Sequence, residues 1–234
     1  MTARRFIAIC LTSAAVAGIG PVRIAGADAE PGVRRPDIER GAVIAAQGVG
    51  NAPGCAQCHA FNGGSDGSGA FPRIAGQSAY YLAGQLRDFT TGVRNNAVMT
   101  PIAKALTADD VADLSAYYAG VESPFLPLPA PDAVLIKRGE QLARTGDAAK
   151  SLQSCDNCHG PGGVGEPPAI PYLAGQYAHY TAFELRMWQQ GFRKNSPDGM
   201  AVIARQMSDQ DIAAVAAYFQ QVRSAAPAMV QSKE

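Results

Sequence analysis

The stretch Cys55-Ala56-Gln57-Cys58-His59 organises this chain, and it recurs one hundred residues later as Cys155-Asp156-Asn157-Cys158-His159. A Cys-x-x-Cys-His sequence is typical of the attachment site for c-type haem. Two cysteines at this spacing on a helical turn can each form a thioether to one vinyl group of a porphyrin, and the histidine can reach the iron. The two copies predict two covalently bound haem c groups. The predicted cofactor-binding residues are Cys55, Cys58, His59, Cys155, Cys158 and His159.

Two other uses of a Cys-x-x-Cys pair are a thioredoxin-like redox motif and half of a zinc site. The redox motif needs no following histidine and usually lies near a βαβ pattern, which is missing from this sequence. A single zinc site made by both pairs would leave both histidines without a role. Haem attachment accounts for both cysteine pairs and both histidines.

The N-terminal segment has the pattern of a targeting sequence. Arg4 and Arg5 precede an apolar run at 6–16, and small residues follow, which predicts a signal peptide over residues 1–29 with cleavage after Ala29, or after Ala27 as second choice. The alternative is an uncleaved membrane anchor, although the run is short for a spanning helix. Haem attachment in bacteria takes place outside the cytoplasm, so we expect a periplasmic protein.

The composition is that of a globular chain long enough for two small domains, with 234 residues, 47% of them hydrophobic, and no formal net charge. Without residues 1–29 it has 17 basic and 19 acidic residues, a formal charge of −2. The absence of a basic stripe argues against nucleic acid or an anionic membrane surface as a partner. All four cysteines beyond residue 29 lie in the two motifs, so none remains for a disulfide.

Hydrophobic periodicity predicts helices at 37–47, 78–91 and 107–119, with Asp37 and Thr107 as N-caps and Gly92 as a C-terminal stop. A loop at 95–101 carries Met99. Four prolines in residues 120–131 predict a semi-rigid linker, since a proline-rich recognition ligand would not be followed at once by a repeat.

A direct repeat follows the linker and predicts tandem domains of one all-α fold, at 30–119 and 132–234. Gly41 and Gly139 occupy the same place in the first helix of each half, which favours a close approach of another helix there. Matching segments are 37–47 with 132–145, 71–77 with 170–176, 92–96 with 191–195, and 99–103 with 200–204.

The alignment of the two halves indicates the second axial ligand of each iron. Met99 is the only methionine between the first motif and the linker, whereas the second half offers Met187, Met200 and Met207. Met200 aligns with Met99, and the distances along the chain agree, with 40 positions from the first motif histidine and 41 from the second. Met187 and Met207 lie on helical patterns that favour core packing. The predicted iron ligands are His59, Met99, His159 and Met200.

Two filled axial positions leave no open site for oxygen or peroxide, which indicates electron transfer and no catalysis, with no catalytic residues. The spare histidine, His179, is expected on the surface or near a propionate.

The chain resembles the di-haem cytochromes c₄, which consist of two class I cytochrome c domains in tandem. The resemblance covers about residues 35–222 and rests on both haem motifs, the Pro-x-x-Ala-Gly-Gln segments ending at Gln77 and Gln176, the methionine loops and the closing helices. It implies two cytochrome-c-like helical bundles, each around one haem, that face each other through haem edges. It also implies that Pro72 and Pro171 lie on the histidine side of their haems. The second half departs from the first at two places. Its loop at 160–168 replaces the longer loop at 60–70, and Trp188 stands where the first half has Phe89.

The resemblance implies a periplasmic carrier of single electrons that donates to a terminal oxidase. We expect its donor to be a quinol-oxidising complex or a dehydrogenase, and its membrane association to be loose and to come through these partners. The alternative is a cytochrome subunit that relays electrons from the catalytic subunit of a dehydrogenase complex. An enzyme, such as a thiosulfate dehydrogenase or a di-haem peroxidase, would need an unusual or labile axial ligand, against which the two methionines argue.

Overall fold

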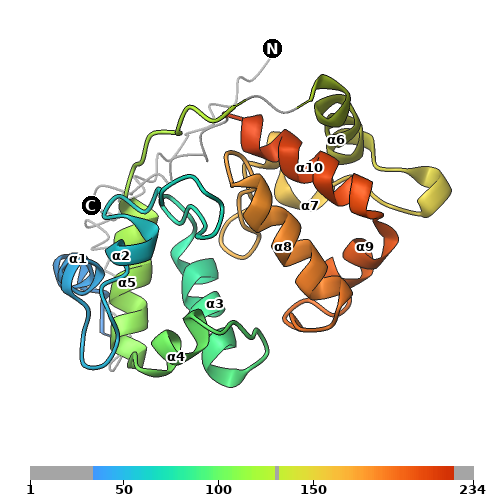
Figure 1. Ribbon diagram of the computed structural model, residues 1–234. Coiled ribbons are helices and arrows are strands. Elements are labelled where there is room, and N and C mark those ends of the chain that lie inside the picture. Colours follow the sequence, from blue (N-terminus) through green and yellow to red (C-terminus); the bar gives the residue numbers. More distant parts are fainter. Residues whose placement is uncertain (1–33, 130–131, 224–234) are drawn as a thin grey trace, which may run out of the picture. The chain divides into compact units, whose positions relative to one another are not determined.

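The computed structural model describes residues 34–129 and 132–223, so the predicted signal peptide and its cleavage site lie outside the described residues. The chain divides into two units, Met1–Arg35 and Pro36–Glu234, and both halves of the repeat belong to the second unit. Within the described ranges the chain forms helices and isolated β-bridges but no strand (Figure 1). The predicted all-α fold is confirmed.

Each half consists of the same succession of helices, in which a short haem-motif helix follows the first long helix. The first half contains α1 (Ile38–Gln47), α2 (Ala56–His59), α3 (Ala79–Thr91), α4 (Met99–Lys104) and α5 (Ala108–Gly120). The second half contains α6 (Ala133–Thr145), α7 (Asp156–His159), α8 (Ala178–Gln189), α9 (Met200–Gln206) and α10 (Asp209–Gln221), with short 3₁₀ helices η1 (Ala148–Lys150) and η2 (Pro161–Gly163).

The helix boundaries follow the capping residues of the sequence. The Asp37 side chain accepts a hydrogen bond from the backbone N–H of Arg40 at the start of α1, and Thr107 forms a reciprocal capping box with Asp110 at the start of α5. Gly92 ends α3 in the left-handed conformation, with φ of 79°. The predicted N-caps and the glycine stop are therefore confirmed.

One predicted loop is partly helical. Residues 95–101 were expected to be irregular, yet Met99 begins α4 and Pro101 lies in its first turn. The Asn96 side chain accepts hydrogen bonds from the backbone N–H groups of Val98 and Met99, both at 2.9 Å. Proline is tolerated in a first turn because its missing N–H would have no helical partner there. The loop therefore ends at Val98, three residues before its predicted boundary.

The long helices of each half approach closely at a glycine. A Cβ atom on Gly41 would lie 2.3 Å from the carbonyl oxygen of Asp113 in α5, and one on Gly139 would lie 2.1 Å from that of Ala214 in α10. Only glycine permits this approach, because a methyl group would overlap the facing backbone. The predicted close helix contact is confirmed in both halves.

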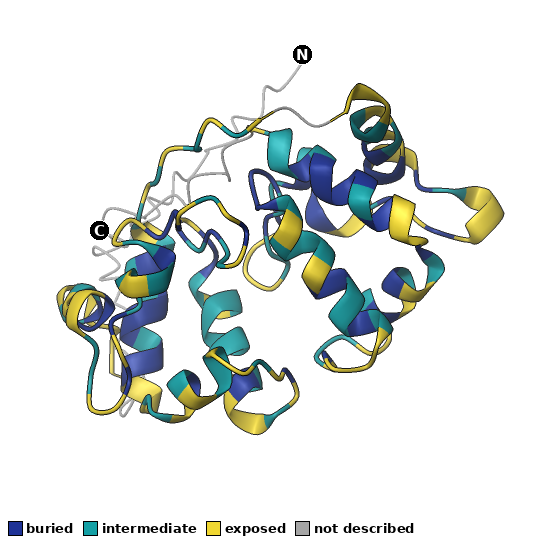
Figure 2. Cartoon of the chain, viewed as in Figure 1, coloured by how far each residue is buried: buried dark blue, intermediate teal, exposed yellow. Residues whose placement is uncertain are grey.

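The two hydrophobic cores differ in size. Figure 2 shows buried residues along α5 in the first half and along α10 in the second. The first core has four buried members, so this half has less apolar packing of its own than the second. The first cluster consists of Ile44, Ala45, Leu114 and Tyr118. The second consists of Leu142, Ala143, Leu152, Leu185, Trp188, Ala201, Ala204, Met207, Ile212, Val215 and Phe219.

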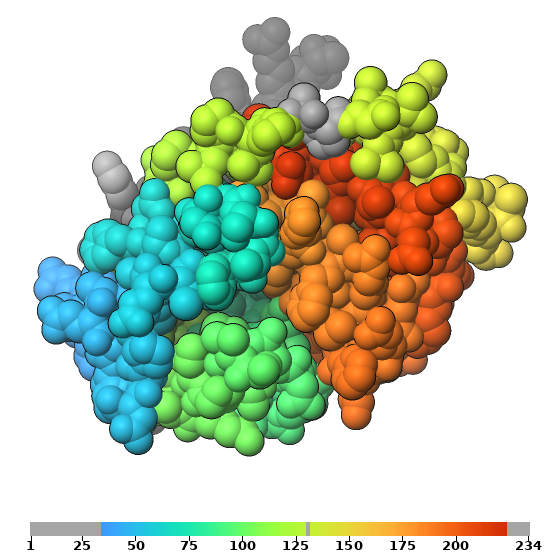
Figure 3. Space-filling view, viewed as in Figure 1, coloured from blue at the N-terminus to red at the C-terminus, as the bar shows by residue number. Residues whose placement is uncertain are grey.

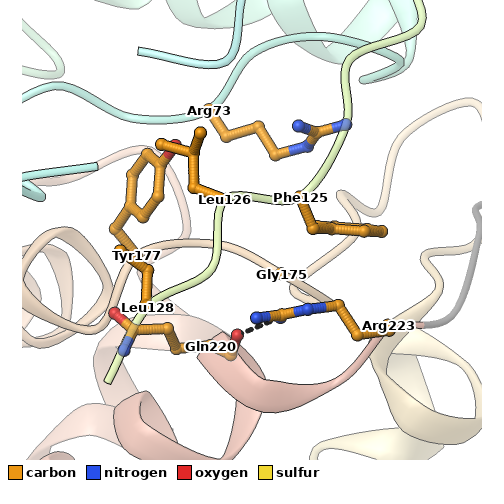
Figure 4. Close-up of a pocket in the computed structure, with 8 residues that line it drawn as sticks. All are labelled: Arg73, Phe125, Leu126, Leu128, Gly175, Tyr177, Gln220 and Arg223. Atoms are coloured by element: carbon orange, nitrogen blue, oxygen red, sulfur yellow. Dashed lines mark hydrogen bonds between the residues drawn. The ribbon is translucent and has the colours of Figure 1, made fainter. Parts of the chain in front are cut away.

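The segment between the halves is extended over 121–129 and is fixed by aromatic and polar contacts. The Arg73 guanidinium donates a hydrogen bond to the carbonyl oxygen of Pro124 at 3.2 Å. Figure 4 shows the Phe125 ring between two guanidinium groups, with Arg73 4.7 Å and Arg223 5.1 Å from the ring centroid. This part of the predicted linker is therefore attached to both halves.

None of the helices within 34–129 and 132–223 is long and apolar enough to cross a bilayer.

Candidate haem sites

Each haem motif forms one helical turn that holds its two cysteines and its histidine together. The backbone N–H of His59 donates to the carbonyl oxygen of Cys55 at 2.9 Å, and that of His159 donates to Cys155 at the same distance. A single turn of this kind has the spacing expected for two thioether links to one porphyrin. The two motifs thus have the same backbone hydrogen bond at the same distance.

A proline carbonyl orients each motif histidine. Nδ1 of His59 lies 3.0 Å from the carbonyl oxygen of Pro72, and Nδ1 of His159 lies 2.8 Å from that of Pro171. Because a carbonyl oxygen only accepts, Nδ1 carries the proton and Nε2 keeps its lone pair. A histidine that binds a metal usually donates its other ring N–H in this way. These contacts place Pro72 and Pro171 beside the histidines, as the resemblance implied.

Burial favours the neutral form of both imidazoles. It lowers the pKa of His59 and of His159, and the hydrogen bond to the proline carbonyl opposes part of this effect. A metal binds the neutral ring through its free nitrogen. Both histidines are therefore in the protonation state and orientation of an iron ligand.

The cysteines are free thiols in the structure and do not resemble a redox dithiol. Burial raises the pKa of Cys55, and it raises the pKa of Cys155 to about 12. A catalytic Cys-x-x-Cys pair instead has a lowered thiol pKa, since the thiolate is the nucleophile. The chemistry of these thiols therefore argues against the thioredoxin-like alternative.

The two candidate methionines hold equivalent places. Met99 is the first residue of α4 and Met200 the first residue of α9, and both side chains are half-buried. Met200 packs against the same hydrophobic cluster as Cys155, whereas Met207 is a buried member of that cluster. Ligation of iron by Met99 and Met200 stays a prediction, which the repeat supports. His179 is exposed on α8.

The residues of the second half fit a group that carries hydrogen-bond acceptors. Nε1 of Trp188 is buried and has no hydrogen-bond partner among the described residues. The guanidinium of Arg193 lies over its ring, 3.7 Å from the centroid. A buried donor without an acceptor is rare in folded proteins, and it indicates that an acceptor-bearing group belongs beside it. Together with Nε2 of His159 and the thiols of Cys155 and Cys158, this indole N–H fits a haem.

Two glutamines connect the histidine side of each half with the other half. The Gln176 side chain accepts from the backbone N–H of Arg73 at 2.9 Å and donates to the Arg73 carbonyl at 2.8 Å. At the equivalent place, Gln77 accepts from the backbone N–H of Tyr172 at 3.4 Å and donates to its carbonyl at 3.5 Å. Figure 3 shows these regions, cyan to teal in the first half and orange in the second, in direct contact. The two Pro-x-x-Ala-Gly-Gln segments therefore recognise each other.

A buried ionic network lies at the same interface. Arg94 forms an ion pair with one oxygen of Glu184, and Arg193 binds the other oxygen at 2.6 Å. Gln85 accepts from both arginines, at 2.9 Å and 2.8 Å. Burial raises the pKa of Glu184, but the two guanidiniums outweigh it and hold this pKa below its ordinary value. The sequence motifs do not predict this network, although the repeat of Arg94 as Arg193 is a signal for it.

Two family models match the chain, one in each half. Residues 38–121 match the model described as cytochrome c, and residues 141–219 match that described as cytochrome c oxidase, cbb3-type, subunit III.

Similar proteins include carriers and a dehydrogenase. Cytochrome c4 of Pseudomonas aeruginosa is 38% identical over 75% of this chain and 87% of its own length. The thiosulfate dehydrogenase electron acceptor of Stutzerimonas stutzeri is 41% identical over 78% of this chain and 86% of its own length. The solved thiosulfate dehydrogenase of Marichromatium purpuratum matches with a TM-score of 0.73 and 38% identity over 79% of this chain. Our chain spans only 40% of that longer dehydrogenase chain. With two haem motifs of one geometry, the chain belongs to the di-haem cytochrome c₄ family of electron-transfer proteins and binds two covalent haem c groups.

Proposed function

We propose that the protein is a periplasmic carrier that takes single electrons from a quinol-oxidising complex or a dehydrogenase and passes them toward a terminal oxidase. It performs no substrate chemistry of its own. The observation that carries this proposal is that two haem motifs, with the same arrangement of cysteines, histidine and proline carbonyl, lie in two halves joined by a buried interface. Such a pair lets an electron enter at one domain and leave at the other.

The haem iron supplies one-electron chemistry when it is bound. The motif cysteines would hold the porphyrin, and His59 and His159 would bind iron through Nε2, while Pro72 and Pro171 fix the imidazole rings. Met99 and Met200 would supply the second protein ligand of each iron. With both positions filled, substrate has no place to bind, which supports a carrier and not an enzyme.

We place the domains at 30–119 and 132–234, on either side of the proline-rich segment 120–131, with the signal peptide at 1–29. A formal charge of −2 on residues 30–234 implies weak long-range steering of partners. Transient redox contacts often bury less than about 1,200 Å² in total. Electron-transfer rates with a partner should therefore fall only modestly as salt is raised.

A second candidate function is the electron-accepting subunit of a dehydrogenase complex. It is favoured by the similarity to the thiosulfate dehydrogenase electron acceptor of Stutzerimonas stutzeri and to part of the Marichromatium purpuratum dehydrogenase. Both candidates move single electrons through the same two sites. They differ in whether the protein leaves its donor between turnovers.

Stopped-flow mixing separates these candidates. The pure two-haem protein is reduced and mixed with membranes that contain a terminal oxidase, and with membranes that lack it. Fast reoxidation that requires the oxidase supports the free carrier. A parallel experiment mixes the oxidised protein with a thiosulfate dehydrogenase and thiosulfate. Failure with every oxidase, together with tight co-purification with a dehydrogenase, would replace the carrier with the subunit.

A further inference from the structure

One peptide group lies between the iron-binding histidine of the first half and a side chain of the second half. This group joins Pro72 to Arg73. Its oxygen accepts from Nδ1 of His59 at 3.0 Å, and its N–H donates to Oε1 of Gln176 at 2.9 Å. A glutamine of one half therefore acts on the histidine of the other through a single peptide unit.

The second half repeats this arrangement with the roles exchanged. The peptide between Pro171 and Tyr172 accepts from Nδ1 of His159 at 2.8 Å. Its N–H points to Oε1 of Gln77, at a longer distance of 3.4 Å. Both glutamines are buried. The two series of hydrogen bonds run in opposite directions across the interface. The bond to the glutamine is the shorter one in the series that starts at Gln176, and the bond from the histidine is the shorter one in the series that starts at Gln77.

Hydrogen bonds at the two ends of a peptide group strengthen each other. When an acceptor binds its N–H, more negative charge collects on its oxygen, and linked bonds gain roughly 10–30% in strength. A stronger acceptor at Nδ1 makes the imidazole a better electron donor through Nε2. A better donor stabilises the oxidised iron and lowers its reduction potential.

We propose that Gln176 is a positioning residue that lowers the reduction potential of the haem in the first domain, and that Gln77 acts in the same way on the second. The inference rests on the proposed function in one respect, the ligation of iron by His59 and His159. It goes beyond that function because each domain sets the potential of the other. Contact between the domains is then a determinant of both potentials.

The geometry makes the two effects unequal. Gln176 is held by its second bond, from Nε2 to the Arg73 carbonyl at 2.8 Å. Oε1 of each glutamine also accepts from the N–H of the next residue at 3.1 Å, so this contact does not distinguish the two. The corresponding bond from Nε2 of Gln77 is 3.5 Å long. Loss of Gln176 should therefore change the reduction potential of the first haem more than loss of Gln77 changes that of the second. The two unequal effects contribute to a difference in reduction potential between two haems that have the same iron ligands.

The test uses the two-haem protein and three variants, Gln176→Met, Gln77→Met and Tyr177→Phe. Tyr177→Phe is the matched control, because its hydroxyl donates across the interface to the carbonyl of Gly64, outside both peptide groups. Redox titration follows each haem separately by its hyperfine-shifted proton resonances. A second readout is the Nδ1 proton of His59 in the reduced, diamagnetic protein.

Gln176→Met should raise the potential of the first haem and leave the second nearly unchanged. At a fixed ambient potential the ratio of reduced to oxidised first haem should rise about two- to fourfold. This corresponds to about 20–35 mV, since tenfold is 59 mV for one electron. The Nδ1 proton of His59 should move upfield as its hydrogen bond weakens. Gln77→Met should give a smaller rise at the second haem, and Tyr177→Phe should leave both potentials unchanged.

Three results would overturn the inference. One is an unchanged first potential in a Gln176→Met protein that keeps both haems. Another is an equal fall of both potentials, which would indicate that water enters an opened interface. The third is an effect of Tyr177→Phe as large as that of Gln176→Met. The wild-type titration tests the proposed function separately, because two reversible one-electron steps with histidine-ligated spectra establish the sites whatever the glutamine variants do.

Discussion

Arg94 and Arg193 bind the two oxygens of one buried carboxylate, that of Glu184, where the two halves meet. The arginines are equivalent in the repeat, but the place equivalent to Glu184 in the first half belongs to Gln85. One carboxylate therefore balances two cations that have little access to water. The charge balance of these two arginines depends on Glu184.

Glu184→Gln should destabilise the protein by about 3–5 kcal/mol, because it leaves two buried guanidiniums without a counter-charge. Denaturant unfolding of the two-haem protein measures the change. The matched control is Glu140→Gln, whose partner Arg144 is 65% exposed, and it should cost no more than about 0.5 kcal/mol. Equal costs for the two variants would contradict the importance of the buried network.

Gly139→Ala should destabilise the second half by about 1–3 kcal/mol, because the new methyl group meets the backbone of α10 and forces the helices apart. The Cβ would lie 2.1 Å from the carbonyl oxygen of Ala214, which cannot move without the helix. Gly120→Ala is the control, since a Cβ there meets nothing within 4 Å. A thermal unfolding midpoint that does not fall in Gly139→Ala would rule out this close contact.

The sequence predicts most of the helices because their signals are local. Asp37, Thr107 and Gly92 each act on backbone groups within a few residues, so their effect is visible without the fold. The haem motifs are local in the same sense. The start of α4 was missed because Pro101 and the asparagines nearby also suit a loop.

The interface could not be predicted in the same way. Gln176 and Glu184 find their partners about ninety to one hundred residues away, and no periodicity indicates which faces of two helical bundles meet. The proline-rich linker suggested separate units, whereas buried polar contacts join the halves. A polar residue repeated at one place, as Arg94 and Arg193 are, marks such a contact but does not identify its partner.

Acid should destabilise the protein through Asp211. Burial by itself raises the pKa of Asp211, but hydrogen bonds from Lys150, Ser208 and Arg138 outweigh it and hold this pKa well below its ordinary 3.8. The ionised group therefore contributes stability above about pH 4, and this contribution is lost as the pH falls toward the folded-state pKa. Asp110, its equivalent in the first half, shifts in the same direction.

Urea unfolding at several pH values tests this expectation. The stability gap between wild type and Asp211→Asn should be largest near pH 7 and should shrink below about pH 4. Asp209→Asn is the control, because this side chain is 83% exposed and its gap should stay below about 1 kcal/mol throughout. A gap for Asp211→Asn that does not change with pH would contradict the role of its charge.

Met200→His should lower the reduction potential of the second haem and leave the first nearly unchanged. A thioether favours reduced iron more than an imidazole does, so the exchange stabilises the oxidised state. Redox titration measures the potentials, and the weak near-infrared sulfur-to-iron band of the oxidised protein should lose one of its two contributions. Met207→Leu is the matched control, since Met207 is 6% exposed in the hydrophobic core and this swap nearly preserves its volume. It should keep both potentials and the full band. Loss of the second-haem contribution in Met207→Leu, with its retention in Met200→His, would assign the ligand to Met207.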